Sequence, residues 1–123
     1  MTNFVLLHGA FHGGWCWPRV AGPLRAAGHA VITPTQTGLG ERAHLLSRDI
    51  TLDVFVQDLT HLLGNGLPCT YVACMDPEYV TLAGHRAFAR AQPGWGYREI
   101  PTGHNPMITA PDLLVALLEE LTA

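Results

Sequence analysis

Apolar residues occur along the chain in short continuous runs, which alternate with stretches where apolar residues recur at helical spacing. The runs at residues 4–7 and 30–33 predict two strands that are buried on both faces. Residues 69–74 predict a third strand. Residues 97–100 predict a fourth, less apolar strand that is suited to the edge of a sheet.

Proline, threonine and glycine mark the ends of the predicted helices. Pro18 begins a helix that runs to about Ala27 and ends at Gly28. Thr51 caps a second helix that extends to residue 63. A cluster of turn-forming residues at 64–68 separates it from the third strand. The apolar positions of the second helix are Leu52, Phe55, Val56, Leu59, Leu62 and Leu63.

Two further helices are predicted in the second half of the chain. Residues 79–91 place four apolar residues on one helical face: Val80, Ala83, Ala87 and Phe88. Pro111 begins the last helix, whose apolar stripe consists of Leu114, Leu117, Leu118 and Leu121. Strand followed by helix therefore occurs four times. This order predicts an α/β fold, with a small parallel sheet of about four strands flanked by helices.

The composition narrows the class of protein. A chain of 123 residues predicts one domain over residues 1–123. A hydrophobic content of 48% with only 14% charged residues indicates surface that is buried against a partner. The net charge of −3 gives no reason to expect a nucleic-acid partner.

No signal peptide or membrane-spanning run is evident. Three cysteines without C-x-x-C spacing suit a reducing compartment, so we expect a cytoplasmic protein.

Four segments carry a resemblance to a known family. Residues 8–17 read HGAFHGGWCW, and residues 26–46 read AAGHAVITPTQTGLGERAHLL. Further on are CTYVACMD at residues 69–76 and PTGHNPM at residues 101–107. These segments resemble the methylesterase and hydroxynitrile-lyase branch of the α/β-hydrolases, and its bacterial relatives even more closely. The resemblance covers almost the whole chain, as an N-terminal half (1–63) and a C-terminal half (67–123) of a reduced α/β-hydrolase domain.

The resemblance implies roles for residues that follow the predicted strands. His104 corresponds to the catalytic base and Asp76 to the carboxylate that orients it, both at the carboxyl ends of strands, where parallel sheets place their sites. The ordinary alternatives are a surface loop histidine for His104 and a turn residue before Pro77 for Asp76. Glu78 is a second candidate partner for His104.

The segment at residues 8–11 resembles the oxyanion loop of the family. There the backbone N–H of Ala10 corresponds to an oxyanion donor, and Phe11, His8 and Trp15 correspond to the substrate-binding loop. For His8 we prefer a packed histidine that bonds to backbone. His12 follows His8 by four residues, but without the glutamate of H-E-x-x-H. We therefore expect no metal site, and no cofactor.

The catalytic serine of the family is missing. The sequence has no G-x-S-x-G elbow, and its one serine, Ser47, has no glycine near it. In the family, the elbow strand and the cap domain come after the helix that corresponds to residues 51–63. Ser47 is interpreted as a solvated loop residue, and Cys74 and Cys16 as packed apolar residues. No replacement nucleophile is therefore predicted.

These observations leave several functions open. The first is a carboxylic ester hydrolase of low activity, in which His104 and Asp76 activate water towards a small ester. The second is a non-catalytic binding or assembly module, and the third is an engineered minimal fragment. For the sheet, either the third strand lies beside the first in the order 2-1-3-4, or two chains share or exchange sheet edges. Exposure of Phe11, Trp15 and Trp17 without a cap favours a homodimer.

Overall fold

A computed structural model describes residues 1–9, 11–63 and 68–122. Four strands lie where the apolar runs predict them, with ends that differ by one or two residues. They are β1 (Asn3–Val5), β2 (Ala30–Ile32), β3 (Thr70–Cys74) and β4 (Gly96–Ile100). The strands form two separate two-stranded parallel sheets, β1–β2 and β3–β4.

The single four-stranded sheet of the prediction is not confirmed. The outer pairs of the order 2-1-3-4 are present, with Phe4 opposite Val31 and Ala73 opposite Glu99. Within the described residues, however, no pairing joins β1 to β3. Each of these two strands therefore has hydrogen bonds along one edge and an unpaired second edge.

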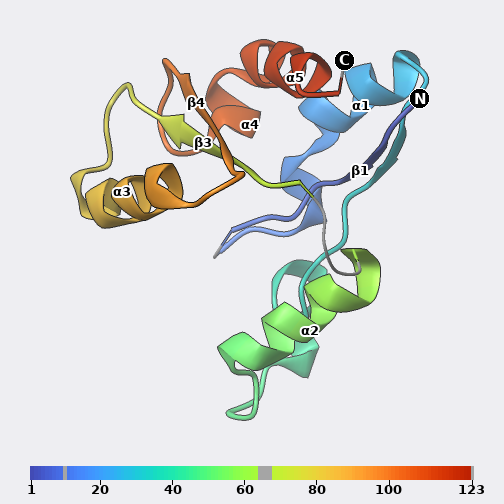
Figure 1. Cartoon of the computed structure of the whole chain (residues 1–123). Coiled ribbons are helices and arrows are strands. Elements are labelled where there is room, and N and C mark those ends of the chain that lie inside the picture. The colour runs from blue at the N-terminus through green and yellow to red at the C-terminus, as the bar shows by residue number, and fades with distance from the viewer. Residues whose placement is uncertain (10, 64–67, 123) are drawn as a thin grey trace.

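The helices begin and end largely at the predicted signals (Figure 1). Pro18 is the first residue of α1 (Pro18–Ala26), and Gly28 follows it with φ of 91°, a left-handed conformation that favours glycine. Thr51 precedes α2 (Leu52–Leu63), and its carbonyl oxygen accepts the N–H of Val54 at 3.1 Å. The other helices are α3 (Ala83–Ala91), α4 (Pro106–Thr109) and α5 (Pro111–Glu120), with short 3₁₀ turns η1 (Gly14–Cys16), η2 (Gly40–Leu45) and η3 (Val80–Leu82).

The core lies between α1, α5 and the two sheets. In Figure 1, α1 and α5 lie at one end of the molecule and α2 lies at the opposite end. The guanidinium of Arg19 in α1 donates to the carbonyl oxygen of Ile108 in α4 at 2.9 Å, and so links the two halves. One cluster of buried apolar residues draws on both halves: Phe4, Leu6, Cys16, Trp17, Val20, Ala21, Leu24, Val31, Ile100, Met107 and Leu114.

The apolar face predicted for residues 79–91 points to solvent. Arg86 and Ala89 are the buried residues of α3, on the side that contacts β3 and β4. Val80 is 77% exposed and Phe88 is 61% exposed. The structure divides the predicted helix into the 3₁₀ turn η3 and the shorter helix α3, and the apolar residues predicted to share its face do not contribute to the core. Among the described residues, no helix is both long and apolar enough to cross a membrane.

Candidate active site

His104 lies in the loop between β4 and α4. The loop is held by buried Thr102, whose N–H donates to the carbonyl oxygen of Ile100 at 2.9 Å and whose hydroxyl bonds that of Thr109 at 2.6 Å. The His104 side chain is exposed, and its ring packs against the ring of Tyr79 with centroids 5.0 Å apart. The base predicted from the sequence is therefore accessible and has an aromatic neighbour.

A cavity of about 270 Å³, which we name the His104 pocket, lies beside this histidine. Its walls come from β3, from Leu7 after β1, from η3 and α3, and from the start of α4. The lining residues are Leu7, Trp17, Tyr71, Val72, Ala73, Cys74, Leu82, Arg86, His104, Pro106 and Met107.

Asp76 lies on the loop that adjoins the His104 loop. Its backbone N–H donates to the carbonyl oxygen of Thr102 at 3.1 Å, and the two loops approach again where Gly103 faces Pro77. The Asp76 side chain is exposed and does not line the His104 pocket. Within the described residues, no ion pair joins Asp76 to His104. The structure brings the two loops together without joining the two side chains.

Arg86 lines the His104 pocket and was not predicted from the sequence pattern. Its side chain is only 7% exposed. The guanidinium donates to the carbonyl oxygen of Tyr79 at 3.1 Å and forms an ion pair with the carboxylate of Glu78. Glu78, the second candidate partner of His104, is thus engaged by Arg86. No sequence signal marked Arg86, because the predicted core face of this segment consisted of Val80, Ala83, Ala87 and Phe88.

The residues of the predicted oxyanion loop lie on the N-terminal half. His8 is buried; its Nε2 accepts the N–H of Gln36 at 3.0 Å, and its Nδ1 bonds the carbonyl oxygen of Gly9 at 2.8 Å. This pattern assigns the proton to Nδ1 and leaves neither ring nitrogen for a substrate. Phe11 is exposed with φ of 66°, and exposed Trp15 stacks on a neighbouring histidine. Ala10 lies outside the described residues.

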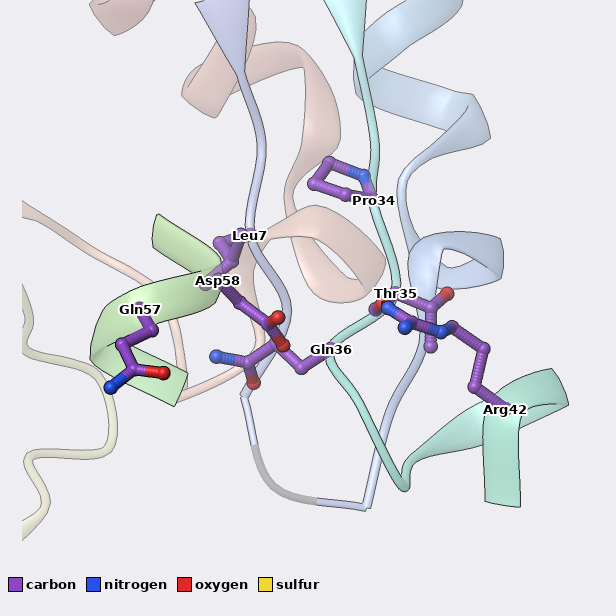
Figure 2. Close-up of a pocket in the computed structure, with 7 residues that line it drawn as sticks. All are labelled: Leu7, Pro34, Thr35, Gln36, Arg42, Gln57 and Asp58. Carbon is purple, nitrogen blue, oxygen red and sulfur yellow. The ribbon is translucent and has the colours of Figure 1, made fainter. Parts of the chain in front are cut away.

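A second cavity, of about 470 Å³, lies between the ends of β1 and β2, η2 and α2; we name it the Arg42–Asp58 pocket (Figure 2). Arg42 donates to the carbonyl oxygen of Thr35 at 2.8 Å, and Asp58 accepts the N–H of Thr37 at 2.9 Å. Figure 2 shows these two charged side chains on opposite sides of the pocket. The lining residues are Leu7, Pro34, Thr35, Gln36, Arg42, Gln57 and Asp58.

The described residues offer no activated nucleophile beside His104. Ser47 is exposed, and its hydroxyl accepts the N–H of Asp49 at 3.2 Å within a local turn. Cys74 lines the His104 pocket, but burial raises the pKa of its thiol above the ordinary 9.0. The thiol therefore stays protonated at neutral pH, whereas the thiolate is the nucleophilic form. Within the described residues, no group of three or more potential ligands is arranged to hold a metal ion.

Comparison with known proteins shows to which family the chain belongs. Residues 4–85 match the Alpha/beta hydrolase family. The chain belongs to that family. Among curated relatives, it is similar to a carbendazim hydrolyzing esterase of Nocardioides sp., with 56% identity over 59 residues that cover 48% of this chain and 24% of the esterase. It is also similar to methylesterase 18 of Arabidopsis thaliana, with 33% identity over 108 residues that cover 75% of this chain and 41% of that protein.

A short segment is similar to methyl jasmonate esterase 1 of Vitis vinifera, with 62% identity over 29 residues that cover 24% of this chain and 11% of that protein. No solved structure matches the chain. The chain spans less than half of the length of these alpha/beta hydrolase relatives. The relatives thus support an esterase-related chain.

Proposed function

We propose that this alpha/beta hydrolase-family chain hydrolyses small, activated carboxylic esters slowly, with water as the nucleophile. In this proposal His104 is the general base and Asp76 orients it. The backbone N–H of Ala10 donates to the oxyanion. The observation that carries the proposal is that exposed His104, in the loop after β4, lines a cavity of about 270 Å³. The esterase relatives support the choice of substrate class.

The proposed reaction needs no side-chain nucleophile. The His104 imidazole accepts a proton from water as the water oxygen attacks the ester carbonyl carbon. The imidazolium then returns the proton to the departing alkoxide. General base catalysis of this kind contributes about 10²–10⁴-fold, and one preorganised oxyanion donor adds about 3 kcal/mol. The expected activity is therefore low, because nothing replaces the covalent step of a serine esterase.

Hydrolysis of 4-nitrophenyl acetate tests the proposal. His104→Ala should lower the rate towards that of buffer, and Asp76→Asn should lower it in part. His44→Ala is the matched control: it removes an exposed imidazole from η2, and any surface imidazole can react with an activated ester. Equal rates for the wild type and His104→Ala would rule out the catalytic proposal.

The second candidate is a non-catalytic module that binds a small polar ligand. It is favoured by the Arg42–Asp58 pocket, which is larger than the His104 pocket and holds charges of both signs. Acetamide is a suitable probe, because its carbonyl oxygen can accept from Arg42 and its N–H groups can donate to Asp58. Saturable NMR shift changes around this pocket, absent in Arg42→Met, would support binding. Shifts that stay linear with acetamide concentration would contradict it.

A further inference from the structure

Trp17 carries a buried hydrogen-bond donor that has no acceptor. The residue lines the His104 pocket and is only 8% exposed, although the sequence predicts an uncovered ring. Its indole Nε1 is buried without a hydrogen-bond partner. An indole nitrogen can only donate, and buried polar groups in folded proteins nearly always have a partner in the protein, a water or a ligand. An oxygen atom bound in the pocket would satisfy this donor.

Arg86 brings a buried positive charge to the same pocket. A guanidinium has five N–H groups. One on Nη1 donates to the carbonyl oxygen of Tyr79, and one on Nη2 donates to the carboxylate of Glu78. Glu78 does not line the pocket, and its side chain is 47% exposed, so water weakens its effect on the charge of Arg86. The guanidinium therefore keeps both charge and donors for a further acceptor.

The rest of the His104 pocket is mostly apolar, and among the described residues no carboxylate side chain lines it. Its volume of about 270 Å³ is just below the range of about 300–1,000 Å³ that holds drug-sized ligands, so it suits a smaller molecule. Ligand pockets commonly combine an apolar lining with a few polar groups that fix orientation. The apolar lining residues are Leu7, Val72, Ala73, Leu82, Pro106 and Met107.

We propose that the His104 pocket binds the anion of a small apolar carboxylic acid. The carboxylate accepts from the guanidinium of Arg86 and from the indole N–H of Trp17. The body of the acid lies against the apolar lining, which an inorganic anion would leave uncovered. A carboxylate suits these donors because it has two acceptor oxygens and forms strong hydrogen bonds with a guanidinium. The choice of ligand rests on the proposed function, since ester hydrolysis beside His104 releases a carboxylic acid.

Titration of the full chain with sodium benzoate, at constant ionic strength, tests this site. In hydrogen–nitrogen correlation NMR spectra, the Trp17 indole signal should shift and saturate, because its N–H gains a charged acceptor. Trp15 and Trp95, which are 59% and 42% exposed and do not line the pocket, provide internal control signals. Benzamide has the same ring but a neutral amide in place of the carboxylate. It should bind about tenfold more weakly than benzoate, or less tightly still.

Arg86→Met removes the charge and should weaken benzoate binding by about tenfold or more. Arg98→Met is the matched control: Arg98 also contacts a glutamate and donates to a tyrosine carbonyl oxygen, but it does not line the pocket. This variant should bind benzoate as the wild type does. The comparison of benzoate with benzamide uses the wild type alone, so it decides the matter even if Arg86→Met fails to fold.

Shifts that stay linear with benzoate concentration, or a Trp17 indole signal that does not move, would overturn the proposal. So would equal affinities for benzoate and benzamide, or a folded Arg86→Met that binds benzoate as tightly as the wild type. Benzoate is not an ester, so this test is separate from the hydrolysis assay. Hydrolysis without benzoate binding would contradict only the carboxylate site, and benzoate binding without hydrolysis would contradict only the catalytic role of His104.

Discussion

Arg86→Met tests whether the buried guanidinium holds the loop between β3 and α3. Arg86 connects α3 to the carbonyl oxygen of Tyr79 and to the carboxylate of Glu78. Methionine retains most of the apolar length of the arginine side chain but removes the charge and its donors. The substitution therefore isolates the polar interactions from the packing.

The contacts of Arg86 determine how far the free energy of unfolding should fall. A hydrogen bond from a charged donor contributes about 1.5–3 kcal/mol, and the bond to Tyr79 is of this kind because Arg86 is buried. The Glu78 side chain is 47% exposed, so its carboxylate regains water when the partner is lost. A pair with one exposed member adds about 1 kcal/mol or less. We therefore expect Arg86→Met to lower the free energy of unfolding by about 1.5–4 kcal/mol.

Urea denaturation measures this loss, with all proteins at one concentration because self-association alters apparent stability. Arg98→Met is the matched control. Arg98 also has a glutamate partner and donates to a tyrosine carbonyl oxygen, but its side chain is 45% exposed. The control should lose about 1 kcal/mol or less. Equal losses for the two variants would refute the argument from burial.

The same variants test the effect of Arg86 on the candidate site. Tyr79 holds its ring 5.0 Å from the ring of His104, and Arg86 binds the Tyr79 carbonyl oxygen. Loss of the hydrogen bond from Arg86 should release Tyr79 and so change the aromatic environment of the His104 ring. In NMR spectra, the His104 ring protons of Arg86→Met should move towards their positions in Tyr79→Leu. Unchanged His104 signals would separate Arg86 from the site.

Two further predictions concern the N-terminal half. A hydrogen bond from the Thr35 hydroxyl holds the pKa of Glu41 below its ordinary value of 4.5. The wild type should thus be more stable than Glu41→Gln above pH 4.5, and pH-dependent denaturation should show this difference disappear as the pH falls through the lowered pKa. A Cβ on Gly14 would lie 2.2 Å from the carbonyl oxygen of Thr33, so Gly14→Ala should cost about 1–3 kcal/mol by urea denaturation. Gly22→Ala, at an open helical site, should be neutral or stabilise by up to about 1 kcal/mol, and equal effects of the two alanines would contradict the contact argument.

Local elements could be predicted from the sequence because their signals are local. Pro18 and Gly28 bracket α1, and the apolar run at residues 30–33 corresponds to β2. The proximity of the Asp76 and His104 loops also follows from a general rule, since each comes after a strand of one parallel pair. Such predictions depend only on the residues close to each position in the sequence and on the way in which parallel strands are connected.

The arrangement of the elements could not be predicted in the same way. Helical spacing indicates that Val80 and Phe88 share a face, but it does not say whether another part of the chain covers that face. The sequence likewise pairs β1 with β2 and β3 with β4 without deciding whether the two sheets join. Burial of Arg86 depends on the same tertiary placement of α3.

The Arg42–Asp58 pocket could not be predicted from the sequence for a different reason. Its residues come from four separate segments, and no motif relates their spacing. Arg42 belongs to η2 and Asp58 to α2, and each is anchored by the backbone of residues 35–37. A pocket that forms where segments meet has no sequence pattern of its own, whereas His104 could be named as a candidate because a family motif contains it.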